Sequence, residues 1–229
     1  MLDYPDNIAC VVWFSGCNMR CHYCHNPQLV KGKGKHSVEE IMEFLNRRIG
    51  KLDGVVLSGG EVTLYPDIIN FIREIKEKGF KVKIDTNGTR PNIIKELLDK
   101  KLIDYVALDY KAPSYKFTDV CVLKERDYNN FKQTLDMLIN QNTVKFEVRT
   151  TVHTSLLQED DITTIIEDLE NSGYKGNYYV QNFVNHDEGQ LLGNLKEQEK
   201  LLEINKIIST ENVKVEFRNF PEKGAGSLK

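Results

Sequence analysis

The sequence has 229 residues, 40% of them hydrophobic, which is enough for a sizeable core, and we expect a single domain spanning residues 1–229. Its net charge of −3 gives no electrostatic reason to expect nucleic acid or an anionic membrane as a partner. No apolar run has the length of a membrane span, and three of the five cysteines are too closely spaced for a secreted disulfide framework, so we expect a protein of the reducing cytoplasm.

Strand-like runs alternate with helical periods along most of the chain. The runs of β-branched and aromatic residues predict strands at residues 8–14, 55–57, 81–85, 105–108, 144–152, 178–180 and 213–217. Apolar residues at helical spacing predict helices from Ser37 to Gly50, from Pro66 to Gly79, after Pro91, and over residues 131–139, 162–173 and 201–208. Residues 112–125 show no clear period, and we predict a loop there.

Six successive strand–helix repeats predict a parallel sheet that either stays open or curls toward a barrel, because parallel connections are right-handed. In both forms the functional loops follow the carboxyl ends of the strands. The chemically unusual residues of this sequence do follow predicted strands, in the segments 17–24, 58–61, 85–88 and 109–111.

Residues 13–27 form the most informative stretch, because they place three cysteines within eight residues at the spacing C-x3-C-x2-C. Three thiolates can hold three irons of a cubane and leave the fourth iron without a protein ligand, and an open metal position is where a substrate can bind. Structural zinc with His22, His25 or His36 as the fourth ligand is the alternative, and the spacing favours the cluster.

The pattern Cys17-x3-Cys21-x-Tyr23-Cys24 resembles the signature of the radical S-adenosylmethionine (radical SAM) superfamily, and residues 16–27 are similar to the activating enzymes of glycyl radical enzymes. With the opening Leu2-Asp3-Tyr4-Pro5, the loop most resembles the short activators of anaerobic ribonucleoside-triphosphate reductase. The resemblance implies one 4Fe-4S cluster bound by the three cysteines, with SAM chelated to the fourth iron. The fold class that we predict is α/β, a partial (β/α)6 TIM-like barrel with mostly parallel strands.

The resemblance also implies SAM-binding residues at the strand ends. The run Ser58-Gly59-Gly60-Glu61 matches the family's Gly-Gly-Glu motif, whose backbone holds the methionine amino group, and glycines let a backbone approach a ligand closely. A monovalent cation beside SAM would be held by Asp85, Thr86 and Asp109. Asn87 and Lys111 would lie nearer the ribose and the carboxylate. The alternative is that these residues only make the turns at the strand ends.

Further contacts are implied around the adenine. Tyr23 would lie by the adenine ring, and the backbone of Tyr23, Cys24 and His25 would contact SAM. Many relatives carry a histidine near the adenosine after the sixth strand, whereas this chain has Gln181-Asn182-Phe183, so Gln181 and Phe183 are our candidates there.

Three further residues lie outside these motifs. Arg149 on the fifth strand either reaches a carboxylate or lies in solvent. Cys10 and Cys121 are expected to be packing residues rather than metal ligands.

The function that we expect is reductive cleavage of SAM to produce a glycyl radical on a partner enzyme. Anaerobic ribonucleotide reductase is the expected partner, and a reduced flavodoxin or ferredoxin-type protein the expected electron donor. One alternative is a radical SAM enzyme acting on a small molecule or another peptide, bound by inner-face residues of the last strands such as Glu147, Arg149, Glu216 and Arg218. The other is a zinc-binding interaction module, which leaves the motifs at the strand ends unexplained.

Overall fold

The computed structural model describes residues 3–24, 26–122, 124–184, 195 and 198–221. Seven parallel strands form one sheet whose order follows the chain from β1 to β7. The observed strands begin and end within two residues of the predicted ones, because short β-branched runs bounded by polar residues mark strands well. They are β1 (Ala9–Phe14), β2 (Gly54–Gly59), β3 (Lys81–Thr86), β4 (Tyr105–Asp109), β5 (Lys145–Val152), β6 (Gly176–Asn182) and β7 (Val213–Arg218).

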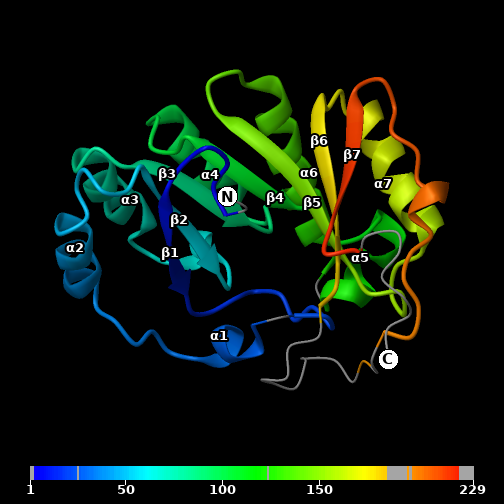
Figure 1. Ribbon diagram of the computed structural model, residues 1–229, viewed down its shortest axis with the longest axis horizontal. Helices are drawn as coiled ribbons and strands as arrows, with labels where there is room; N and C mark the ends of the chain where they lie inside the picture. Colours follow the sequence, from blue (N-terminus) through cyan, green and yellow to red (C-terminus); the bar gives the residue numbers. More distant parts are fainter. Residues whose placement is uncertain (1–2, 25, 123, 185–194, 196–197, 222–229) are drawn as a thin grey trace.

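The strand order does not reverse anywhere, unlike the order of a doubly wound sheet. Right-handed connections between strands in this order place every connecting helix on the same face, and the sheet curls away from the helices. Figure 1 shows the helices on the outside of a curved sheet, with β1 and β7 as its two ends. The predicted α/β fold, a partial barrel of parallel strands, is confirmed.

The connecting helices form where apolar residues recur at helical spacing. A capping box begins the helix predicted from Ser37, since the Ser37 hydroxyl accepts a bond from the Glu40 N–H and the Glu40 carboxylate accepts one from the Ser37 N–H. That helix ends at Asn46, before the predicted end at Gly50, and Ile49 beyond it is 53% exposed. The helices are α2 (Val38–Asn46), α3 (Ile68–Glu77), α4 (Pro91–Asp99), α6 (Glu125–Asn140) and α7 (Glu159–Asn171).

Alternate residues of each strand point to opposite faces of the sheet. On the outer face Leu57, Ile84 and Leu108 are fully buried under the helices, and each such side chain contributes about 1.5–3 kcal/mol of hydrophobic stabilisation. On the concave face the same strands carry Ser58 and Asp85 one residue further along. The strand period therefore directs polar side chains to the inside of the curve.

Two predictions about the connecting segments are wrong. Residues 112–125 contain the helix α5 (Ser114–Cys121), whose Phe117 and Val120 are buried. The helix predicted at residues 201–208 is reduced to one 3-10 turn, Ile204–Lys206; Leu202 is buried, but Ile208 is 75% exposed, so the apolar residues do not share one buried helical face. None of the helices in the described ranges is long and apolar enough to cross a membrane.

Candidate functional site

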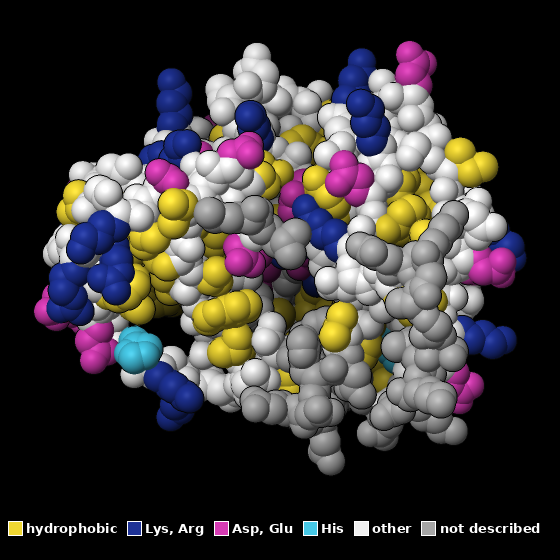
Figure 2. All heavy atoms as spheres, in the orientation of Figure 1, with side chains coloured by type: hydrophobic (Ala, Val, Ile, Leu, Met, Phe, Trp, Pro, Cys, Tyr) yellow, Lys and Arg dark blue, Asp and Glu magenta, His cyan; other side chains and the backbone are white. Residues whose placement is uncertain are grey.

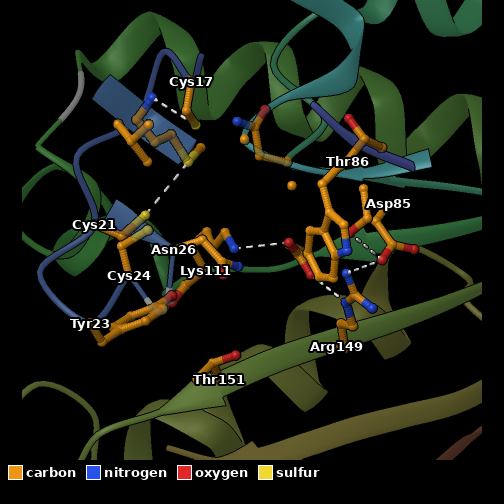
Figure 3. A pocket seen from close by; sticks show the side chains of 18 of the residues that line it. Cys17, Cys21, Tyr23, Cys24, Asn26, Asp85, Thr86, Lys111, Arg149 and Thr151 are labelled. Carbon is orange, nitrogen blue, oxygen red and sulfur yellow. Dashed lines mark hydrogen bonds and ion pairs between the residues drawn. The ribbon is translucent and has the colours of Figure 1, made fainter. Parts of the chain in front are cut away.

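A cavity of about 290 Å³ lies on the concave face where the strands end, near the lower limit of about 300 Å³ for small-molecule pockets. Figure 3 shows the cysteines on one side of it and Asp85 and Arg149 on the other, with Lys111 between them. Most of the residues predicted from sequence lie in its lining, so the fold brings together segments that are far apart in the chain. These residues are Cys17, Cys21, Tyr23, Cys24, Ser58, Gly59, Gly60, Asp85, Thr86, Asn87, Asp109, Lys111, Arg149 and Gln181.

The cysteine loop is held between two helices. On one side the Gly16 N–H donates to the Leu29 carbonyl of α1 (Pro27–Lys31), at an N–O distance of 2.7 Å. On the other side the Arg20 N–H donates to the Cys121 carbonyl at 2.9 Å, at the end of α5. The helix that the sequence did not reveal therefore supports the loop that carries the three cysteines.

The three thiols differ in their surroundings. Burial raises the pKa of Cys17 to about 12 and also raises that of Cys24, whereas the Cys121 side chain hydrogen-bonds Cys21 and lowers its pKa. Among the described residues, which leave out His25, no three Cys, His, Asp or Glu side chains converge tightly enough to hold a single metal ion.

All three thiols nevertheless line one cavity, and ligands to separate irons of a cubane need not converge on one point. The donor set is also all sulfur, since neither His22 nor His36 is in the lining and His36 is an exposed side chain 3.5 Å from Glu40. The arrangement fits a cluster bound by three cysteines better than a zinc ion completed by either histidine.

Cys121 is fully buried behind Cys21 and is not in the cavity lining. We expect Cys121→Ser to bind the same amount of iron and sulfide as the wild type after anaerobic reconstitution, because serine keeps a hydrogen-bond donor beside Cys21. Iron and acid-labile sulfide per chain give the measurement. Loss of iron in this variant would make Cys121 a ligand rather than a packing residue.

Charged side chains of alternating sign cross the inner face of β3, β4 and β5. Arg149 lies between two aspartates, with Nε 2.5 Å from Asp109 Oδ1 and Nη2 3.2 Å from Asp85 Oδ2. Lys111 Nζ is 2.9 Å from the second oxygen of Asp109, and Lys83 Nζ is 2.6 Å from that of Asp85. Arg149 thus faces the cavity and not the solvent (Figure 3).

This network fixes the protonation of both aspartates. Burial alone would raise the pKa of Asp109, but the charges of Arg149 and Lys111 outweigh it and lower the pKa to about 2. At Asp85, too, burial alone would raise the pKa, but the charges of Arg149 and Lys83 lower it below its usual value. Both carboxylates are ionised at neutral pH, and Lys111 and Arg149 are the cations of this network that line the cavity.

Glu61 joins two loops and does not line the cavity. One carboxylate oxygen accepts bonds from the hydroxyls of Thr63 (2.6 Å) and Thr86 (2.8 Å), and the other accepts the Asn87 N–H (2.7 Å). Its side chain is almost fully buried, and burial raises its pKa although these hydrogen bonds lower it in part. Glu61 therefore holds the loop after β2 against the loop after β3.

The two glycines before Glu61 allow the loop after β2 to lie against the cysteine loop. A Cβ on Gly60 would stand 1.9 Å from the Gly16 carbonyl oxygen, and Gly59 has a φ of +118°, which L side chains rarely adopt. The Glu61 N–H donates to that Gly16 oxygen at 2.9 Å. A side chain at Gly60 would push the two loops apart, and one at Gly59 would meet the Phe14 backbone of β1.

Asn18 completes the link between the three loops, and sequence analysis did not identify it. Its Nδ2 donates to Thr89 Oγ1 at 2.7 Å, and its Oδ1 accepts from Asn87 Nδ2 at 3.0 Å. The only signal was its place directly after Cys17, because its partners lie 69 and 71 residues away in the chain. Asn18 fastens the cysteine loop to the loop after β3.

We expect Asn18→Ala to lower the free energy of unfolding by about 1–3 kcal/mol, because it leaves Asn87 and Thr89 without their partner in a buried network. Urea unfolding under reducing, anaerobic conditions gives the measurement. The matched control is Asn140→Ala, whose exposed side chain bonds only the Asp136 carbonyl and which should change stability by no more than about 0.5 kcal/mol. Equal costs for the two variants would contradict the role given to Asn18.

Some predicted residues lie elsewhere. Phe183 is 6% exposed and packs on His153 with ring centroids 5.1 Å apart, outside the cavity lining. Glu147 and Arg218 also lie outside it, and bind each other at 3.4 Å while Arg218 stacks over the Tyr179 ring. His25 falls outside the described residues.

Comparison with known proteins gives one family. The model of the radical SAM superfamily matches residues 11–180. A protein of Methanocaldococcus jannaschii with the provisional name of glycyl-radical enzyme activating enzyme is 39% identical over 187 residues, covering 80% of this chain and 75% of its own. The pyruvate formate-lyase-activating enzyme of Clostridium pasteurianum is 39% identical over 105 residues, covering 43% of this chain and 44% of its own.

Solved structures share the fold at low sequence identity. The crystal structure of Streptococcus suis SuiB matches with a TM-score of 0.69 at 16% identity, over 96% of this chain and 50% of SuiB. SuiB bound to S-adenosylmethionine matches with a TM-score of 0.65 at 15% identity, over 96% of this chain and 52% of that one. The present chain thus spans about half the length of the solved protein it matches.

Proposed function

Because this chain belongs to the radical SAM superfamily, we propose that it is an activating enzyme, which uses a 4Fe-4S cluster and SAM to place a glycyl radical on a partner enzyme. One observation carries the proposal: the three cysteines of the family signature line the same cavity as Lys111 and Arg149. The similarity to activating enzymes of glycyl radical enzymes supports the choice within the superfamily.

The residues of the cavity fit the two groups that the family implies. Cys17, Cys21 and Cys24 would hold three irons of the cluster. The backbone of Gly59 and Gly60 and the cations of Lys111 and Arg149 would hold the amino and carboxylate groups of SAM, and Tyr23 and Gln181 would lie at its adenine. When bound, cluster and SAM supply one-electron cleavage of the sulfonium and transfer of one hydrogen atom from the glycine Cα, with methionine and 5′-deoxyadenosine as products.

The chain's own side chains prepare the cavity for this ligand. Lys111 and Arg149 present positive charge to a carboxylate, and Asp85 and Asp109 hold both cations in place through the ion pairs described above. Arg149 already supplies positive charge between Asp85 and Asp109. The monovalent cation expected at Asp85, Thr86 and Asp109 would therefore have to share the two carboxylates with Arg149.

The proposal also covers the partner enzyme, the electron donor and the cellular setting. We take anaerobic ribonucleotide reductase as the partner on the resemblance of residues 2–5 and of the cysteine loop to its activators. A reduced flavodoxin or ferredoxin-type protein is the proposed electron donor, and a single domain in the cytoplasm the proposed setting. One solved relative, SuiB, has been crystallised with a precursor peptide, which supports a polypeptide substrate for this fold.

The test is anaerobic. The protein is reconstituted with iron and sulfide, reduced, and incubated with SAM and either anaerobic ribonucleotide reductase or pyruvate formate-lyase. A glycyl radical seen by electron paramagnetic resonance, with matching 5′-deoxyadenosine, supports the proposal, and a partner whose reactive glycine is changed to alanine is the control. Formation of 5′-deoxyadenosine with no radical on either partner favours a small-molecule or other peptide substrate. Absence of both products contradicts the proposal.

A further inference from the structure

The chain contains one tryptophan, and its side chain lies in the wall of the cavity. Trp13 is in the cavity lining and is 54% exposed. Along β1, Val11 and Trp13 face the cavity, while Cys10 and Val12 pack against the core. Across the sheet Trp13 is paired with Ser58, whose hydroxyl donates to Asp85 at 2.9 Å. The indole therefore stands next to the charged network of the site.

Packing within the chain does not account for this position. Other inner-face residues nearby, Val56 and Lys83, are 1% exposed, whereas the indole keeps about half of its surface in solvent. A large aromatic side chain that keeps half of its surface in water forgoes much of the hydrophobic stabilisation it would gain by burial. Figure 2 shows hydrophobic side chains beside the hollow in this face of the molecule.

Trp13 also lies at the rim of the cavity. Over the described part of the chain, β1 pairs only with β2 and is an edge strand of the sheet. The side chains suited to the amino-acid part of SAM are deeper, because Asp85, Lys111 and Arg149 are only 13%, 17% and 17% exposed. The indole is therefore the more solvent-exposed part of the cavity wall.

In the proposed reaction, a segment of a folded partner has to reach this cavity and hold a glycine there. Glycine has no side chain to be recognised, so affinity must come from its peptide groups and from neighbouring residues. Aromatic side chains offer a large contact area with few rotatable bonds and often dominate such interfaces. We propose that Trp13 contacts the glycine-bearing segment of the partner and helps to determine which partners are accepted, an inference that rests on the proposed function.

The single tryptophan makes the contact directly observable. The probe is a tryptophan-free peptide of about ten residues, copied from the reactive-glycine segment of the partner that is activated in the experiment above. A peptide of this length includes residues on both sides of the glycine, which could contact Trp13. The reconstituted protein is titrated anaerobically with SAM alone and with the peptide in the presence of SAM. We expect the tryptophan emission to shift with the peptide and to stay nearly constant with SAM alone.

Two variants separate recognition from SAM binding. Trp13→Ala should raise the KM for the peptide at least ~10-fold, a typical loss for an aromatic interface residue, with a smaller rise for Trp13→Phe. The dissociation constant of SAM, measured by equilibrium dialysis, should rise less than the KM for the peptide. Ile49→Ala, which removes an apolar side chain of equal exposure outside the cavity lining, is the control and should change neither.

An emission shift with SAM alone, together with equal losses of SAM and peptide affinity in Trp13→Ala, would assign the indole to SAM and overturn the inference. An unchanged KM for the peptide would overturn it as well. Both results leave the proposed function standing, provided that the wild type forms the glycyl radical on a partner. A wild type that forms no glycyl radical on either partner overturns the proposed function and this inference together.

Discussion

Replacing Cys21 by alanine is expected to remove the iron–sulfur cluster and to lower SAM cleavage by more than ~100-fold, because even the loss of an outer partner of a metal ligand costs about 10–100-fold. Cys21 is one of three thiols in the cavity lining, and the two that remain cannot hold three irons. Iron and acid-labile sulfide per chain, followed by 5′-deoxyadenosine after anaerobic reduction, give the measurement.

The matched control for this variant is Cys10→Ala. Cys10 lies on β1 with its side chain packed against the core, and it is not in the cavity lining. We expect the Cys10→Ala variant to keep the iron content and the SAM cleavage rate of the wild type. Wild-type cleavage by Cys21→Ala would show that the cysteine loop does not hold the catalytic group, and the proposed function would then be wrong.

Replacing Arg149 by methionine is expected to lower the free energy of unfolding by about 3–5 kcal/mol, the usual cost of removing one member of a buried ion-pair network. The Arg149 side chain is 17% exposed and bonds both Asp85 and Asp109, so its loss leaves two carboxylates facing each other with less positive charge between them. Urea unfolding of the reduced protein at pH 7 gives the measurement. Arg47→Met, which breaks an exposed pair with Glu43, should cost at most about 1 kcal/mol.

The pH dependence of this cost gives an independent check. In the wild type the pKa of Asp109 is lowered to about 2, so its contribution to stability is present above the pKa of the unfolded chain and is lost only as the pH falls toward 2. In Arg149→Met the buried aspartates should bind protons more readily than in the unfolded chain, so acid relieves their repulsion. The difference in stability between the two proteins should therefore shrink as the pH falls from 7 to 4. A constant difference would show that the cost comes from lost packing.

The strands and the positions of the site motifs were predictable because both depend on local sequence. The end of a short apolar strand marks where polar side chains face the cavity, and this rule placed Ser58, Asp85 and Asp109 there. Helix α5 was missed because it has only eight residues, too few for a clear period. The segment 201–208 differs in the opposite way, since Leu202 and Ile207 are buried although the segment forms only one 3-10 turn. Apolar spacing alone does not show that a buried segment is helical.

The contacts that complete the site were not predictable from one sequence. Nothing local shows that Asn18 meets Asn87, that Arg149 meets Asp85 as well as Asp109, or that Lys83 is buried beneath them. Each of these depends on which strands become neighbours after folding. The resemblance implied that Glu61 lies at the SAM site, whereas in the structure its carboxylate joins Thr63 in its own loop to Thr86 at the end of β3. This contact, too, depends on which strands become neighbours.

The hydrogen bonds that join Asn18, Glu61 and Asn87 run entirely between groups of the protein, so the three loops owe their arrangement to the chain itself. Asn18 bonds the loop after β3, and Glu61 bonds both the cysteine loop and the loop after β3. A displacement of the cysteine loop would therefore be passed to the other two loops through these bonds.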